Sequence, residues 1–230
     1  METQKQVWEK LWQDTAFDDL DVKEYHLDLK KIIEELPDVR TTIEIGSGTG
    51  ITSLLLSNEI ASTLLDFDGG ILKKAELLFT NCNKKAAFVE CDMFDLSTIK
   101  DKYDVVFNSG VIEHYNAKER ARLLKEYAKI MEKGGAMIIA VPNHYCIPYK
   151  LGYVALRCLG QWKFPKEYAI KNLSQELEEA GLMLEKRIIT SNTLIENSIG
   201  NRLLKRIYLC FKRIFKIQGY LRVFVIRENL

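Results

Sequence analysis

Short runs of apolar residues alternate with longer stretches of helical period along this chain. Continuous apolar runs are typical of strands buried on both faces of a parallel sheet. Helical stretches between such strands cross one face of the sheet and bring the chain back to the edge where the next parallel strand starts. The pattern therefore predicts an α/β fold in which helices cover both faces of a parallel sheet.

The bounds of the elements follow from the same pattern. Strands are predicted at Thr41–Ile45, Ser62–Phe67, Ala87–Glu90, Tyr103–Asn108, Ala136–Val141, Leu182–Thr190 and Tyr220–Arg227. Helices are predicted at Val7–Trp12, Tyr25–Leu36, Ser53–Leu56, Gly70–Phe79, Lys118–Met131, Ser174–Ala180 and Asn201–Ile217. Pro37 should end the second helix, because proline cannot continue a helix interior. Gly134 with Gly135, and Gly181, are expected to cap later helices at their C-terminal ends.

No Pro/Gly/Ser-rich linker, internal repeat or low-complexity stretch divides the sequence, so residues 1–230 are expected to form a single domain. Residues 1–40 should form an N-terminal helical cap before the first strand. Residues 143–172 mix Tyr, Trp, Leu and Gly without a clear period, and we interpret them as a lid. Residues 198–218 are predicted to be a basic, amphipathic helical insertion.

The predicted insertion has two distinct sides. Its basic residues fall within about 120° of a helical wheel; they are Arg202, Lys205, Arg206, Lys212, Arg213 and Lys216. The other side carries Leu203, Ile207, Cys210, Phe211 and Ile214. Such a helix can lie on an anionic membrane surface, as a peripheral contact through residues 201–217. The interpretation that we favour from the sequence is that the apolar side packs on the sheet and the basic side is solvated.

Composition and charge narrow the partners. The chain has 33 Lys and Arg against 32 Asp and Glu, a formal net charge of +1, so no global field attracts nucleic acid. The first residues lack the apolar core of a secretory signal, and no apolar run approaches the roughly 20 residues of a membrane span, so we expect a cytoplasmic protein. The 5 cysteines contain no Cys-x-x-Cys pair. We expect reduced, mostly buried thiols and no metal site.

A glycine-rich loop follows the first predicted strand and opens a helix, at the position where open α/β sheets bind ligands. Residues 44–50 read Glu-Ile-Gly-Ser-Gly-Thr-Gly. A dinucleotide fingerprint needs glycine where Ile51 stands, and a phosphate-binding Walker loop needs a lysine before Thr52. The carboxylate of Glu44 disfavours a polyanion and suits a ligand with an ammonium and a sulfonium, such as S-adenosylmethionine. The alternative is a tight turn that binds nothing.

Acidic residues at the ends of the next two strands complete this pattern. Asp66 ends the second strand, where a carboxylate can accept both hydroxyl hydrogens of a ribose; the neighbouring Asp68 is the weaker alternative. Asp92 and Met93 follow the third strand. Asp92 can accept from an adenine amino group while Met93 packs on the ring, although Met93 also fits an ordinary core position.

Taken together, these segments resemble the class I S-adenosylmethionine-dependent methyltransferases, especially the small-molecule branch that includes ubiquinone-biosynthesis O-methyltransferases. The segments are 44–50, 65–68 with Leu72 and Ala75, 91–93, 103–106 with 113–114, and 134–135 with 141–143. The resemblance implies a Rossmann-like, doubly wound sheet of seven strands whose last strand is antiparallel. Gly69–Gly70 and Leu182 depart from the usual family pattern, and neither is expected to touch the cofactor.

The resemblance also implies which residues bind the cofactor. Glu44, Gly46 and Gly48 would contact its methionine part, Asp66 its ribose, and Asp92 with Met93 its adenine. Asn108 and Ser109 would line the methyl donor site. The full set of predicted cofactor-binding residues is Glu44, Gly46, Ser47, Gly48, Gly50, Asp66, Phe67, Asp92, Met93, Asn108 and Ser109.

The acceptor side is less constrained by the sequence. Methyl transfer is an in-line displacement that needs alignment more than a catalytic dyad. His114, after the fourth strand, and His144, after the fifth, are candidate bases, and a positioning role is the alternative for His114. The aromatic residues of 143–172 fit either a cover for an apolar or ring-bearing acceptor or simple packing of the lid; they are Tyr145, Tyr149, Tyr153, Trp162 and Phe164.

The sequence thus predicts an enzyme that methylates a small molecule with S-adenosylmethionine and leaves S-adenosylhomocysteine. The chain lacks the Asp/Asn-Pro-Pro-Tyr/Phe motif after the fourth strand that resembles the amine-holding motif of DNA amino-methyltransferases, so no nucleic acid partner is expected. A non-catalytic S-adenosylmethionine-binding subunit is the alternative function. A nicotinamide-dependent oxidoreductase is disfavoured by the spacing of the glycines.

Overall fold

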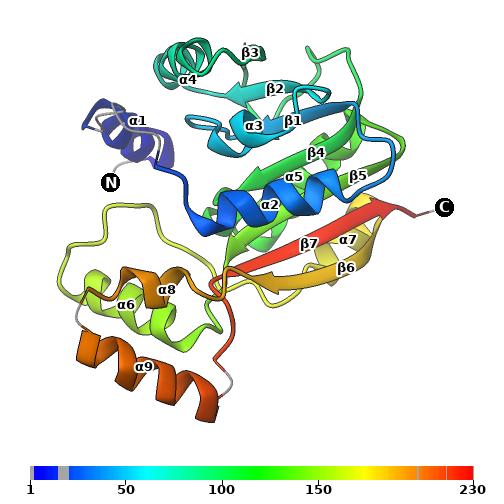
Figure 1. Cartoon of the computed structure of the whole chain (residues 1–230). Helices are drawn as coiled ribbons and strands as arrows, with labels where there is room; N and C mark the ends of the chain where they lie inside the picture. Colours follow the sequence, from blue (N-terminus) through cyan, green and yellow to red (C-terminus); the bar gives the residue numbers. More distant parts are fainter. Residues whose placement is uncertain (1–2, 15–20, 201, 216, 230) are drawn as a thin grey trace.

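A single seven-stranded sheet forms the centre of the protein (Figure 1). The computed structural model describes residues 3–14, 21–200, 202–215 and 217–229. The strand order is β3-β2-β1-β4-β5-β7-β6, and β7 is antiparallel to both of its neighbours while β1 to β5 pair in parallel. The strands are β1 Thr41–Ile45, β2 Ala61–Asp66, β3 Ala87–Glu90, β4 Tyr103–Ser109, β5 Met131–Pro142, β6 Leu182–Thr190 and β7 Leu221–Glu228. The predicted sheet, with its antiparallel last strand, is confirmed.

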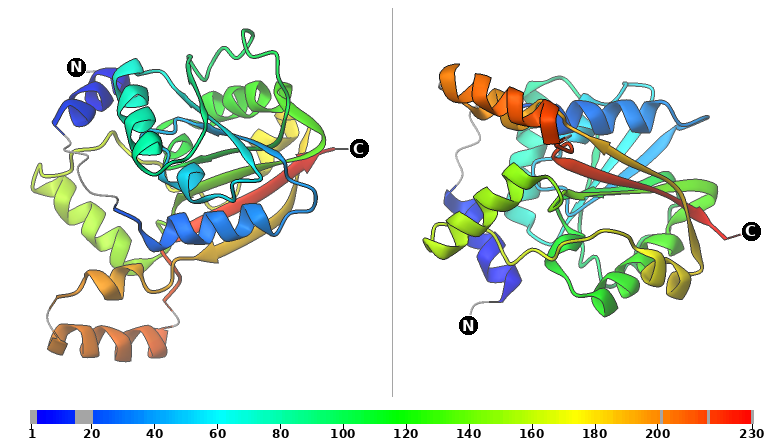
Figure 2. Two further views of the ribbon diagram at one scale, coloured as in Figure 1. Left: turned by 45° about the horizontal axis from the view of Figure 1, so that its top comes forward. Right: turned by 90° about the horizontal axis from the view of Figure 1, so that it is seen from below.

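Helices cover both faces of this sheet, as predicted. α5 and α7 pack on one face, while α2, α3 and α4 pack on the other. α1 lies over the carboxyl ends of the strands, and α6, α8 and α9 gather at the same end of the sheet (Figures 1 and 2). The helices are α1 Gln4–Asp14, α2 Glu24–Glu34, α3 Ile51–Leu55, α4 Gly69–Asn81, α5 Ala117–Lys129, α6 Ile147–Cys158, α7 Ser174–Ala180, α8 Leu194–Ser198 and α9 Arg202–Phe215, with a short 3-10 turn at Ile112–His114.

Alternation along each strand decides which side chains reach which helical layer. Ile43 and Ile45 of β1 are fully buried in the core under α5 and α7. Between them, Glu44 points to the opposite face and meets Ser53 of α3. The side chain of Glu44 is therefore placed between the sheet and the helix that follows the glycine-rich loop.

One predicted helix end is wrong. Gly134 and Gly135 were expected to cap α5, but α5 ends at Lys129 and both glycines lie within β5. The pairing of β5 with β4 jumps from Tyr103 opposite Met131 to Val105 opposite Ala136, so the glycines form a bulge. Gly134 has a φ of 81°, a conformation that glycine adopts without strain.

The predicted packing of the basic insertion is also wrong. α9 forms, but the apolar side chains expected to pack on the sheet are 67% (Leu203), 45% (Ile207), 52% (Phe211) and 72% (Ile214) exposed. The faces of the sheet are already covered by other helices, so the insertion is held at the end of the sheet instead. The predicted Asn201 and Lys216 lie outside the described residues.

The expected burial of the cysteines is not observed. All are free; Cys146 is buried and Cys91 is partly buried, whereas Cys82, Cys158 and Cys210 are exposed. Among the described residues, we find no helix with the length and apolar character required to cross a membrane.

Candidate functional site

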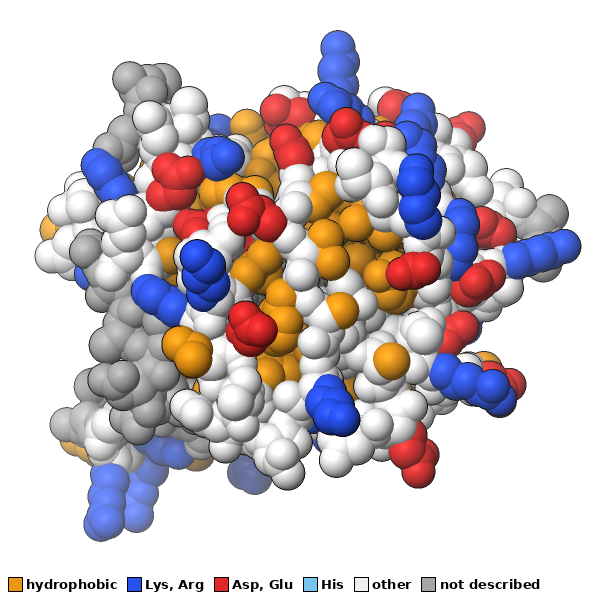
Figure 3. All heavy atoms as spheres, turned by 90° about the horizontal axis from the view of Figure 1, so that it is seen from above, with side chains coloured by type: hydrophobic (Ala, Val, Ile, Leu, Met, Phe, Trp, Pro, Cys, Tyr) orange, Lys and Arg blue, Asp and Glu red, His pale blue; other side chains and the backbone are white. Residues whose placement is uncertain are grey.

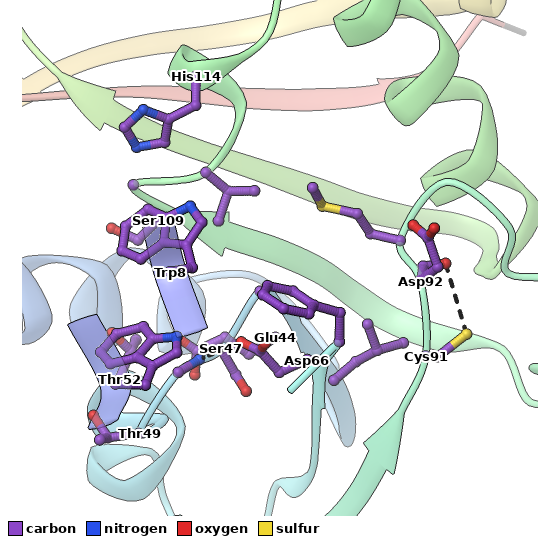
Figure 4. A pocket seen from close by; sticks show the side chains of 18 of the residues that line it. Trp8, Glu44, Ser47, Thr49, Thr52, Asp66, Cys91, Asp92, Ser109 and His114 are labelled. Carbon is purple, nitrogen blue, oxygen red and sulfur yellow. Dashed lines mark hydrogen bonds between the residues drawn. The ribbon is translucent and has the colours of Figure 1, made fainter. Parts of the chain in front are cut away.

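A cavity of about 630 Å³ lies at the carboxyl ends of β1, β2, β3 and β4, under α1 (Figure 4). Figure 4 shows His114 and Trp8 at one end of it and Asp92 with Cys91 at the other, with Glu44, Ser47 and Asp66 between them. Parallel strands that end at one edge bring residues from distant parts of the sequence together in this way.

The glycine-rich loop forms one wall of the cavity. Gly46 and Gly48 have φ values of 64° and 54°, which favour glycine. A Cβ on Gly48 would lie 3.2 Å from the ring of Trp12, so α1 packs directly on this loop. Gly50 does not line the cavity: a Cβ there would lie 2.0 Å from the side chain of Leu64. Its predicted cofactor contact is therefore replaced by a packing role.

Asp66 lies at the centre of the cavity and is 4% exposed. Its Oδ2 accepts a hydrogen bond from the backbone N–H of Gly48 (2.9 Å), and its Oδ1 accepts from that of Asp68 (3.2 Å). Burial raises the pKa of this carboxyl, and these backbone donors oppose the shift. The alternative, Asp68, caps α4 by accepting from Gly70 and Ile71. Asp66 is thus the carboxylate that lines the cavity, and Asp68 stabilises a helix.

Glu44 lines the cavity from the face of the sheet under α3. Its Oε2 accepts from Ser53 Oγ at 2.6 Å. Burial raises the pKa of Glu44 to about 7, while the hydrogen bonds from Ser53 lower it and the nearby Asp66 raises it further. The carboxyl of Glu44 consequently changes charge near neutral pH.

This raised pKa makes stability depend on pH. The folded state holds the proton of Glu44 up to about pH 7, whereas the unfolded chain releases it near its ordinary value of 4.5. Glu44 therefore favours folding below pH 4.5, and this contribution is lost as the pH rises through 7. Between pH 4.5 and pH 7, the free energy of unfolding of the wild type should therefore fall by about 3 kcal/mol relative to that of Glu44→Gln. Urea unfolding at several pH values measures it.

The matched control for this prediction is Glu59→Gln, which changes an exposed glutamate. Its stability should follow the pH dependence of the wild type. If Glu44→Gln and the wild type also give parallel curves, Glu44 does not titrate as described.

The opposite end of the cavity combines a carboxylate with apolar side chains. Asp92 Oδ1 accepts from the backbone N–H of Phe94 at 2.9 Å, which fixes the loop after β3. Met93 lines the cavity, and its sulfur accepts a hydrogen bond of 3.5 Å from the hydroxyl of Tyr127. Phe67 also lines this region, with the ammonium of Lys5 5.1 Å from its ring centre. The arrangement suits a flat, polar-edged ring.

Of the two residues at the end of β4 that were predicted to line the cavity, only one does so. Ser109 lines the cavity, whereas Asn108 is fully buried and donates from Nδ2 to the hydroxyl of Tyr127 on α5 at 3.3 Å. Asn108 shares its side of the strand with Val106, which packs in the core under α5. The interpretation of Asn108 as a cavity residue is therefore corrected.

His114 lies at the end of the cavity near Trp8, whose ring centre is 5.4 Å away. Its Nδ1 is 3.2 Å from the carbonyl oxygen of Lys166. A carbonyl only accepts, so Nδ1 carries the proton and Nε2 is left as an acceptor in the neutral ring. Burial lowers the pKa of His114, and it raises that of Glu113 well above its ordinary value. A neutral imidazole at neutral pH is suited to accept a proton.

His144, the second candidate base, does not line the cavity. It is 7% exposed, and its Nε2 is 2.8 Å from Glu167 Oε2, which also accepts from the hydroxyl of Tyr149 at 2.7 Å. Its ring contacts Tyr149 and Tyr153 of α6 edge-on. The predicted lid aromatics likewise lie outside the cavity wall and link α6 through Trp162 and Phe164 to Trp8.

Several lining residues were missed by the sequence analysis. They come from α1, from the start of α2 and from the turn after β4, and they are Lys5, Trp8, Trp12, Tyr25, His26 and Tyr115. Two tryptophans four residues apart on one face of a short N-terminal helix were the available signal. The pKa of His26 is lowered to about 4 by burial, so this ring too is neutral at pH 7.

Comparison with known proteins finds similarity to methyltransferases. Residues 43–135 match the family model described as "Methyltransferase domain". Probable tRNA methyltransferase 9B of Mus musculus is 26% identical over 144 residues, which cover 61% of this chain and 30% of that protein. The human protein of the same name is 26% identical over 141 residues, 60% of this chain and 29% of that protein. The chain thus corresponds to less than a third of the length of these curated relatives.

Solved structures share the whole architecture. The N-methyltransferase NodS from Bradyrhizobium japonicum WM9, in complex with S-adenosylhomocysteine, has a TM-score of 0.64 at 14% identity and covers 97% of this chain and 99% of its own. Magnesium protoporphyrin IX methyltransferase from Synechocystis PCC 6803, also with S-adenosylhomocysteine, has a TM-score of 0.60 at 16% identity and covers 97% and 94%. Residues 43–135 are therefore similar to a methyltransferase domain, and the chain shares its overall fold with these two solved methyltransferases.

Proposed function

We propose that this protein transfers the methyl group of S-adenosylmethionine to a hydroxyl group of a small molecule with an apolar or aromatic body. One observation carries the proposal: a single cavity holds Asp66 beside the glycine-rich loop and, at its far end, a neutral His114 among aromatic rings. Asp66 and the loop suit the cofactor, and His114 suits an acceptor hydroxyl.

The residues around the loop fit the cofactor. Ser47 Oγ is buried and, among the described residues, has no hydrogen-bond partner, so it is available to a ligand. Gly46 and Gly48 present backbone without a Cβ to the cavity, which allows the methionine part to lie close. Asp66 would accept from the ribose hydroxyls, and Asp92 from the adenine amino group. When bound, the cofactor supplies a methyl carbon activated by its positive sulfur.

The far end of the cavity suits a ring-bearing acceptor. Trp8 and the neutral His114 form the wall there, and Tyr25 and the neutral His26 also line the cavity, which gives apolar contact with few charges. His114 Nε2 would take the proton of the acceptor hydroxyl as its oxygen is methylated. Burial raises the pKa of Glu113, whose Oε1 lies 3.9 Å from Nε2, and so disfavours a carboxylate that would compete for that proton.

The test is a methyl-transfer assay with S-adenosylmethionine labelled in its methyl group. The acceptors are ring-bearing phenols, matched anilines, matched carboxylic acids and bulk tRNA. Bulk tRNA is included because the curated relatives are named as probable tRNA methyltransferases. We expect label in the phenols at a rate at least tenfold above the other classes. Transfer to tRNA alone would contradict the small-molecule proposal.

Calorimetry with S-adenosylhomocysteine separates binding from transfer. Binding without label in any acceptor is the behaviour of a non-catalytic subunit, and it would contradict the enzymatic proposal. Tighter binding of NAD than of S-adenosylhomocysteine would contradict the cofactor assignment.

A further inference from the structure

Helices α6 and α9 expose apolar side chains at one end of the molecule. They lie with α8 outside the two helical layers, and α9 is outermost (Figures 1 and 2). Ile207 and Ile214 of α9 are 45% and 72% exposed, and Leu151 and Val154 of α6 are 65% and 47% exposed. Isolated apolar residues on a surface are ordinary, but stripes of them on two helices at the same end of the molecule mark an interaction surface.

The way α9 is attached explains why its apolar stripe faces outward. Lys212 Nζ donates to Glu196 Oε2 of α8 at 2.9 Å, and Lys205 Nζ donates to Asn197 Oδ1 at 3.3 Å. The side chains of Leu203, Ile207, Phe211 and Ile214 lie on average roughly 155° away around the helix from this attached face. The contacts with α8 therefore fix the stripe toward solvent.

The charge of this surface has one sign. The sequences of α6 and α9 contain Lys and Arg but no Asp or Glu, although the whole chain is nearly balanced. Arg202, Arg206 and Arg213 are exposed and form a row beside the apolar stripe of α9. By contrast, Figure 3 shows acidic and basic side chains intermixed around the hydrophobic ones on the face seen from above.

We propose that α6 and α9 form a docking surface for a lipid bilayer that contains anionic headgroups. The apolar stripes would enter the boundary between headgroups and acyl chains, while the arginine row would contact lipid phosphates. A second copy of the chain is disfavoured, because a two-fold interface would bring two surfaces of the same positive sign together. Nucleic acid is disfavoured, because phosphate contacts leave the exposed apolar stripes without a role.

The experiment is co-sedimentation of the full chain with vesicles, either of phosphatidylcholine alone or of equal parts phosphatidylcholine and phosphatidylglycerol. We expect binding to the mixed vesicles at least tenfold above binding to neutral ones, and a decline as salt is raised. Ile207→Ser with Ile214→Ser should weaken binding by about tenfold or more, and Arg206→Glu with Arg213→Glu should abolish it. Circular dichroism and binding of S-adenosylhomocysteine establish that each variant is folded.

The matched control is Leu77→Ser on α4, which removes an apolar side chain that is 65% exposed but lies away from this surface. It should bind vesicles as the wild type does. Failure of the wild type to bind mixed vesicles overturns the proposal, as does equal binding by the double isoleucine variant. If the wild type does not bind vesicles but forms a dimer that the double isoleucine variant loses, the surface is a contact between two copies of the chain. If it instead binds RNA and only the arginine variant loses that binding, the surface is a nucleic acid contact. None of these readouts requires methyl transfer, so the proposal stands or falls separately from the catalytic one.

Discussion

Replacing Asp66 by alanine is expected to weaken the binding of S-adenosylhomocysteine by about 100-fold or more. A carboxylate that accepts two ribose hydroxyls makes two charge-assisted hydrogen bonds, each worth about 1.5–3 kcal/mol, and 1.4 kcal/mol corresponds to a factor of ten. Asp66 also receives the N–H of Gly48, so its loss loosens the loop that would hold the methionine part. Isothermal titration calorimetry with the purified protein measures the effect directly.

The control for this prediction is the neighbouring carboxylate. Asp68→Asn keeps a side-chain oxygen at the N-cap of α4 while removing the charge, so it should leave the affinity within about threefold of the wild type. Equal weakening by Asp68→Asn and Asp66→Ala would mean that general negative charge, not a specific hydroxyl contact, binds the ligand. Unchanged affinity in Asp66→Ala would contradict the cofactor site as a whole.

The strand framework could be predicted because its residues carry a strong, local pattern. β1, β3 and β6 begin and end at the predicted residues, because each is a short run of residues whose apolar pattern favours a strand. The helix end at Gly134 was mispredicted, because the same glycines that cap helices also allow a bulge, and only the pairing of β4 with β5 distinguishes the two.

The carboxylates that line one side of the cavity could be predicted from the sequence for a related reason. Asp66 and Asp92 stand at or just after strand ends, and parallel topology places such ends at one edge. Asn108 shows that a position at the end of a strand does not by itself place a side chain in the cavity. Asn108 stands two residues after Val106, so both side chains point to the face of the sheet under α5, and this alternation could be read from the sequence.

The proposed acceptor side and the proposed docking surface depend on tertiary contacts between segments far apart in the chain. Trp8 reaches His114 because α1 folds back over the strand ends, which no local pattern specifies. The hydrophobic stripe of α9 was visible in the sequence, but its direction is set by the contacts of Lys205 and Lys212 with α8. Amphipathicity identifies a face of a helix and does not specify what covers it.

His114→Asn should lower kcat by about 100-fold or more with a phenolic acceptor, and it should leave the affinity for S-adenosylhomocysteine unchanged. A general base contributes about 10²–10⁴-fold. The asparagine amide can still donate to the Lys166 carbonyl as Nδ1 does, so it keeps the position of the turn and removes the acceptor at Nε2. The variant therefore separates proton removal from positioning, which His114→Ala would not.

The pH dependence gives an independent readout of the same role. Because burial lowers the pKa of His114, the base is already deprotonated at neutral pH, so at saturating S-adenosylmethionine the kcat/KM of the wild type for the phenol should rise with pH below about 6.5. This acidic limb lies below the titration of Glu44 near pH 7. His114→Asn should lose that acidic limb and keep a low, level rate. A variant that retains wild-type kcat and the acidic limb would make His114 a positioning residue, with its Nδ1 contact to the Lys166 carbonyl as its contribution.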